Sequence, residues 1–77
     1  MDATQNTQNL EKIGRLIDLT ADRATAEENI DKKHAWLAAR DHLVYAARCL
    51  RMEVPQYDRA GRHLEAARRI MAQEVRA

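Results

Sequence analysis

The fold is decided by one stretch of the chain, Thr25 to Val54, which reads TAEENIDKKHAWLAARDHLVYAARCLRMEV. It contains neither glycine nor proline, and it is rich in alanine, leucine, arginine and lysine, all of which favour the α-helix. At its start, Thr25 and Glu28 have the spacing of a capping box, in which each side chain bonds to the other residue's backbone N–H. Just after its end, Pro55 disfavours helical backbone at the preceding residue. We therefore predict one long helix over about residues 25–53.

Apolar side chains follow this predicted helix along two sides. The main stripe, spaced by three or four residues, contains Trp36, Ala39, Leu43, Ala46, Ala47, Leu50 and Val54. The second stripe contains Ile30, Leu37 and Val44 and is flanked by Tyr45 and Met52. A helix with one apolar side needs one neighbour, whereas this helix needs two. We expect the main stripe, with the single tryptophan, to form the core.

A shorter helix is expected before this stretch. Its apolar residues have helical spacing over about residues 9–22, and they are Leu10, Ile13, Ile17, Ala21 and Ala24. Residues 1–8 are polar and are interpreted as a flexible tail. Gly14 lies close to the apolar stripe, where close packing against a neighbour would explain a residue that weakens a helix.

The connection between the first and second helices has two interpretations. In the first, a turn within residues 20–25 folds the short helix back on the long one. In the alternative, one continuous helix runs from about Leu10 to Glu53 and pairs with a second chain as a coiled coil. We prefer the turn, because the capping box marks a new helix start.

A third helix is predicted over about residues 55–76. Pro55 suits a first-turn position, and the apolar stripe that follows contains Tyr57, Ala60, Leu64, Ala67, Met71 and Val75. The short link to the preceding helix requires an antiparallel hairpin. The sequence thus predicts an all-α fold: a small three-helix bundle built on a long antiparallel hairpin, with a short first helix folded back on it. Residues 9–77 form its single helical domain.

Composition limits the classes of protein to which this chain can belong. Its 77 residues suffice for one small domain, and a formal net charge of +1 argues against non-specific binding to nucleic acid. No stretch is apolar enough to span a membrane, and no signal peptide is recognised. The single cysteine, Cys49, cannot form an internal disulfide. We therefore expect a cytoplasmic protein that does not contact membranes.

The residues capable of metal binding or nucleophilic catalysis do not form a recognisable motif. His34, His42 and His63 lack the spacing of a helical zinc pair, and Cys49 is not part of a Cys-x-x-Cys motif. A nucleophilic pair of Cys49 with His42 would need a third, orienting group and an oxyanion site. We predict a protein that is not an enzyme, with no catalytic residue, no metal and no cofactor.

The candidate partner-binding residues lie in the second half of the long helix. A short first helix covers Ile30 and Leu37 but runs out near Arg40. The side chains left beyond its reach are Val44, Tyr45, Arg48 and Met52. Aromatic residues, methionine and arginine are enriched in protein interfaces. The leading hypothesis is therefore an adaptor, co-chaperone or inhibitor that masks a partner's surface; a self-associating homodimer is an alternative.

A second candidate surface is basic. It contains Arg48, Arg51, Arg59 and Arg62, which would lie around the link between the second and third helices. Such a cluster can contact phosphate groups, so a nucleic-acid-binding regulator is a further alternative. The acidic residues Glu53, Asp58 and Glu65 neutralise much of this charge, and no helix-turn-helix pattern is visible. Nucleic acid is therefore the less favoured partner.

The last 40 or so residues resemble two families of helical proteins. Tyr57, Ala60, Leu64 and Ala67 fit the second helix of a tetratricopeptide repeat, whereas Val44 and Arg48 depart from the first. With Gln56-Tyr57 after a short turn, the hairpin is also similar to the small co-chaperones of type III secretion systems. Either resemblance implies binding to another protein, by a helix lying in a groove.

Overall fold

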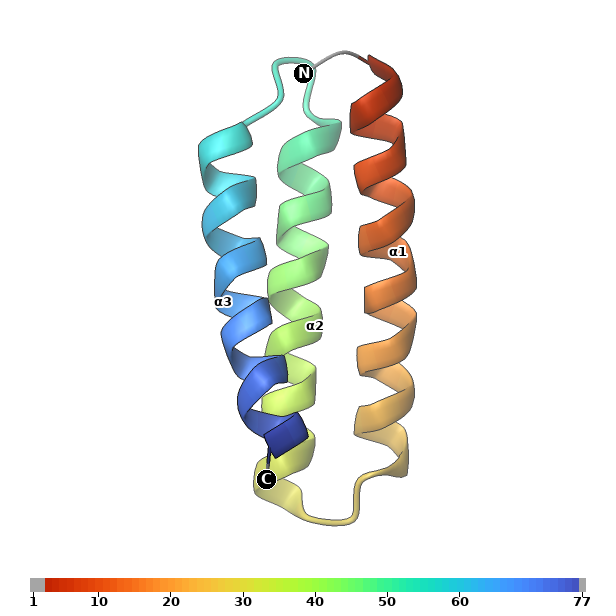
Figure 1. Cartoon of the computed structure of the whole chain (residues 1–77), viewed down its shortest axis with the longest axis vertical. Helices are drawn as coiled ribbons and strands as arrows, with labels where there is room; N and C mark the ends of the chain where they lie inside the picture. The colour runs from red at the N-terminus through yellow and green to blue at the C-terminus, as the bar shows by residue number, and fades with distance from the viewer. Residues whose placement is uncertain (1–2, 77) are drawn as a thin grey trace.

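The structure, a computed structural model, describes residues 3–76. It consists of three α-helices joined by short links: α1 (Ala3–Ala26), α2 (Ile30–Arg51) and α3 (Tyr57–Arg76). The helices run alternately up and down along a body of 40 × 18 × 18 Å (Figure 1). The predicted all-α three-helix bundle is confirmed.

Helix α2 lies between the other two and packs against both of them (Figure 1). Across residues 3–76, no Cα atom of α1 comes within 8 Å of a Cα atom of α3. The long-range packing of the backbone therefore runs through α2. The central helix has two neighbours, as predicted, but the reason given was wrong: both pack on the main stripe, and Ile30 of the second stripe, which the first helix was expected to cover, is 59% exposed.

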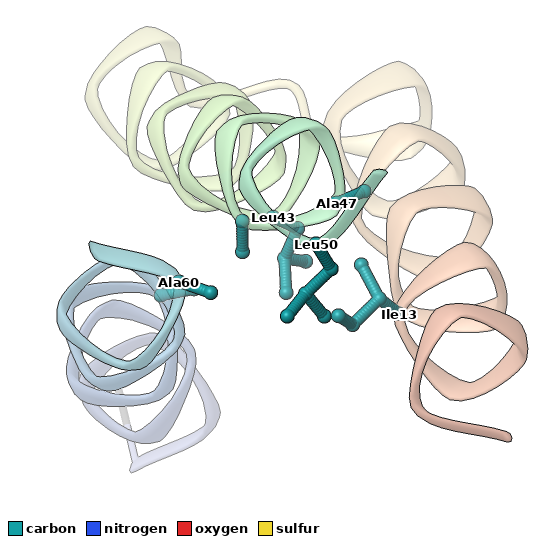
Figure 2. Close-up of a cluster of buried hydrophobic side chains, with 7 residues drawn as sticks. Ile13, Leu43, Ala47, Leu50 and Ala60 are labelled. Atoms are coloured by element: carbon teal, nitrogen blue, oxygen red, sulfur yellow. The ribbon is translucent and has the colours of Figure 1, made fainter. Parts of the chain in front are cut away.

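The core lies on one side of α2, where small side chains alternate with leucines. The buried residues of α2 are Trp36, Ala39, Leu43, Ala46, Ala47 and Leu50. Ile13 of α1 and Ala60 of α3 reach the same cluster from either side (Figure 2). The predicted main stripe is therefore confirmed except for Val54, which lies beyond the end of α2 and is 72% exposed.

Helix α1 is longer than the sequence predicts at both ends. It begins at Ala3, so the prediction of a flexible tail is wrong for residues 3–8, and residues 1–2 lie outside the described range. The half-buried Asn6 donates a hydrogen bond from Nδ2 to the carbonyl oxygen of Leu50, at 3.1 Å. That carbonyl is one of the last four of α2, which have no partner within the helix. A polar side chain thus anchors the first turns of α1 to the end of α2.

The chain turns between α1 and α2, as preferred, but at residues 27–29 instead of 20–25. The capping-box prediction is wrong, because Thr25 is still inside α1 and its hydroxyl donates to the Ala21 carbonyl at 3.0 Å. Asn29 caps α2 instead: its Oδ1 accepts from the N–H groups of Asp31 and Lys32 at 3.0 and 3.2 Å. The long helix therefore has 22 residues and spans 30–51, not 25–53.

Pro55 separates α2 from α3 as predicted, although it belongs to neither helix. Helix α2 ends at Arg51, and the N–H of Gln56 donates to the Cys49 carbonyl at 2.9 Å, which closes the turn. Helix α3 begins at Tyr57, two residues later than predicted, after the Gln56 carbonyl accepts the first helical bond from Ala60. The hairpin of α2 and α3 is antiparallel, as expected (Figure 1).

The explanation offered for Gly14 is wrong. A Cβ atom built at Gly14 would meet no atom within 4 Å outside its own neighbourhood, so close packing does not require a glycine. The fully buried position of α1 is occupied by a polar residue, Thr20, and not by Gly14. Thr20 is fully buried, with its hydroxyl 2.9 Å from the carbonyl oxygens of both Leu16 and Ile17. Such back-bonding satisfies a hydroxyl inside a helix.

The cap of α2 can be tested by comparing two substitutions. Asn29→Ala removes the acceptor for two N–H groups and should lower the free energy of unfolding by about 1 kcal/mol. Thr25→Ala, at an exposed position inside α1, should change it by less than about 0.5 kcal/mol. Urea denaturation followed by circular dichroism measures both. A larger loss for Thr25→Ala would restore the capping box.

Gly14→Ala should stabilise the protein, because alanine loses less conformational entropy in a helix and its methyl group has space. The expected gain in the free energy of unfolding is about 0.5–1 kcal/mol. Gly61→Ala in α3 is the matched variant, since its Cβ would also meet nothing within 4 Å. A loss of stability at Gly14 in the same denaturation assay would show that the glycine serves packing after all.

Candidate functional site on the outer face of α2

The predicted partner-binding residues lie on the side of α2 that points away from the core. Tyr45 and Met52 are each 50% exposed, Arg48 is exposed and Val44 is half-buried. The reason given for their exposure is wrong, because α1 runs the whole length of α2 and does not stop near Arg40. They are exposed because α1 and α3 both pack on the opposite side. Their role in binding stays a prediction.

A shallow hollow of about 160 Å³ lies at the middle of this face. It is lined by four residues of α2: Asp41, Val44, Tyr45 and Arg48. Their spacing is i, i+3, i+4 and i+7, the set of four side chains that surrounds a knob residue when two helices pack. The hollow has a carboxylate at one end, a guanidinium at the other and apolar side chains between them.

The Tyr45 ring is held from two sides. The guanidinium carbon of Arg48 lies 5.6 Å from the centre of the ring, within the range of a cation–π contact. The ring of His63, from α3, lies 5.5 Å away at a tilt of 30°. These contacts fix the tyrosine in place while half of its surface remains open to solvent, which reduces the entropy lost when a partner binds.

His63 also connects α3 to α2 through His42. The two Nδ1 atoms are 3.0 Å apart, so one ring donates a hydrogen bond to the other, and which of them donates depends on the tautomers. From the sequence, a pair of His42 with Cys49 was considered and rejected, and the pair of His42 with His63 was missed. An antiparallel hairpin brings such residues near each other, but residue 42 lies nine residues before the end of α2 and residue 63 six after the start of α3, so the spacing alone did not pair them. Cys49 is half-buried with a free thiol.

The four arginines of the alternative nucleic-acid surface are all exposed: Arg48, Arg51, Arg59 and Arg62. Arg48 and Arg62 line different hollows, one on α2 and one on α3. A wide hollow of about 490 Å³ along α3 includes Arg62, but Asp58 and Glu65 also line it. Arg69, on its rim, is 3.4 Å from Glu65 in an exposed ion pair. Carboxylates of this kind oppose the approach of phosphate groups.

Among residues 3–76, no three or more His, Cys, Asp or Glu side chains are grouped so that they could hold a metal ion. Within the same range, no helix combines the length and the apolar character that crossing a membrane requires.

The histidine pair can be tested by a double-mutant cycle with His42→Ala, His63→Ala and the double variant. Because the rings share a hydrogen bond, we expect a coupling of about 0.5–1.5 kcal/mol in the free energy of unfolding. The exposed His34 supplies the control: His34→Ala should change stability by less than about 0.5 kcal/mol. Additive losses for the two substitutions in urea denaturation would contradict the shared bond.

Comparisons with known proteins do not add to the geometry of this face. The tetratricopeptide-like and co-chaperone-like resemblances of the α2–α3 hairpin remain predictions. No protein-family model matches the chain, and neither a curated protein nor a solved structure does.

Proposed function

We propose that this chain is a small, non-enzymatic protein–protein interaction module that binds its partner through the outer face of α2. We propose that it acts as an adaptor, a co-chaperone or an inhibitor by masking a surface of its partner. Because the lone Cys49 suits a reducing compartment, we assign it to the cytoplasm.

The observation that carries the proposal is the half-exposed Tyr45, fixed by Arg48 and His63 at the edge of a hollow. Met52, the C-cap residue at the end of α2, follows Tyr45 by seven residues and is equally exposed. Binding energy in protein interfaces is concentrated in a few such residues, with tyrosine and arginine enriched among them. Exposed apolar side chains that lie together on one face, unlike scattered ones, often mark a site of protein interaction, which supports a partner here.

The surface offered is one helix face, which favours a helical partner. Packed helices present apolar residues that recur on one face, and on the outer face of α2 they recur every seven residues, or about two turns, at Ile30, Leu37 and Val44. The bounds of α2 give this face a length of about 33 Å, at 1.5 Å for each of its residues. A partner helix of ordinary length is therefore accommodated along it.

A capture experiment tests the assignment of the face. The double variant Tyr45→Ala/Met52→Ala, immobilised and exposed to extract of the native cell, should retain its partner at least about tenfold less well than the parent protein. Mass spectrometry identifies what is retained.

The matched control for this experiment is Tyr57→Ala/Val75→Ala, which removes a tyrosine and an aliphatic residue of α3 that are 41% and 71% exposed. This control should bind as the parent does. Undiminished capture by Tyr45→Ala/Met52→Ala would refute the proposed face, and loss confined to the control would move the site to the hollow on α3.

A further inference from the structure

The hollow on α2 specifies the helix that fits it. Asp41, Val44, Tyr45 and Arg48 surround a space for one knob side chain, with the carboxylate at one end and the guanidinium at the other. A complementary helix therefore needs an apolar knob, a basic residue about one turn to one side of it and an acidic residue about one turn to the other. The basic residue must meet Asp41, and the acidic residue must meet Arg48.

Helix α2 itself has this pattern. Around Tyr45, Arg48 follows three residues later and Asp41 precedes by four. If a second α2 runs antiparallel with its Tyr45 in the hollow, its Arg48 lies beside Asp41 and its Asp41 lies beside Arg48. Residues 41 and 48 are equidistant from the midpoint between Val44 and Tyr45, at about 5 Å along the axis, so both charge pairs form together.

We infer that the occupant of this face is a second copy of the chain, packed antiparallel about a two-fold axis that passes between Val44 and Tyr45. This rests on the proposed function and names its partner. An interface of this symmetry uses the same patch on both subunits, so each residue contact occurs twice. In the same register Met52 lies opposite Leu37 of the other copy, and the two tyrosines meet beside the axis.

The charges also fix the direction of the pair. A parallel arrangement would place Asp41 against Asp41 and Arg48 against Arg48, which is repulsive. Asp41 contacts Arg40 of its own helix at 3.3 Å through Oδ1, in an exposed pair that leaves the carboxylate accessible. Within residues 3–76, α1 and α3 both pack on the other side of α2, so neither helix obstructs the approach of a second copy (Figure 2).

A charge-swap experiment tests the inference by sedimentation equilibrium. One helix face against its copy is small for an interface, so the parent protein should pass from monomer to dimer between about 10 µM and 1 mM. Asp41→Arg and Arg48→Asp each create two like-charge contacts and should weaken dimerisation at least about tenfold. Their equimolar mixture restores both opposite-charge contacts and should form a heterodimer, and the double variant D41R/R48D should form a homodimer.

The substitutions should not unfold the protein, because Asp41 and Arg48 are exposed. The circular dichroism of each variant should therefore match that of the parent, and weaker dimerisation would not reflect a loss of folding. Either of two results overturns the inference: a parent protein that stays monomeric throughout this range, or single variants that still dimerise as the parent does. A mixture of folded single variants that stays monomeric overturns the antiparallel register.

A monomeric parent would leave the face to another protein. The capture experiment with Tyr45→Ala/Met52→Ala then decides the proposed function on its own, because it does not depend on self-association.

Discussion

The bundle depends on the close approach of two helices to one side of α2 at small side chains. Ala39, Ala46 and Ala47 are at most 2% exposed and leave room for neighbouring backbones, while Leu43 and Leu50 fill the space between them. Because α1 and α3 share this side, the opposite side of α2 is left largely open within residues 3–76, where His63 of α3 reaches it at the Tyr45 ring. The core and the candidate site are therefore two results of one arrangement.

The spacing of apolar residues was sufficient to predict the core of α2 and the number of helices. It failed where buried positions are polar. Asn6, Ile13 and Thr20 follow each other at intervals of seven along α1, and only Ile13 contributes to an apolar pattern. Asn6 reaches the end of α2 and Thr20 is fully buried, so the true face of α1 extends further than its leucines and isoleucines indicate.

The helix boundary before α2 shows a different limit. Thr25 and Asn29 are both good capping residues, and the local sequence favoured Thr25 because Glu28 completes the box. The structure continues α1 to Ala26 and places the cap at Asn29. Ala24, which the apolar spacing already included although the predicted helix stopped at residue 22, is buried and so stabilises the last turns of α1. Competition between two adequate caps is settled by tertiary contacts.

At the site, the residues predicted to be exposed are exposed, but the reason predicted for their exposure was incorrect. Tyr45 and Met52 are open because they face away from both neighbours, not because α1 is short. The stacking of His63 on Tyr45 required the register of the α2–α3 hairpin, which the turn length only approximates. The charged ends of the hollow become informative once Asp41, Tyr45 and Arg48 are known to share one open face.

The separation of α1 from α3 has a consequence for how the protein opens. Since the backbones of these two helices do not approach each other within the described residues, α2 is the element that transmits cooperativity between them. Detachment of α1 leaves the contacts between α2 and α3 in place, and the reverse also holds. Amide hydrogens of the outer helices are thus expected to exchange through two sub-global openings, with those of α2 protected until both have occurred.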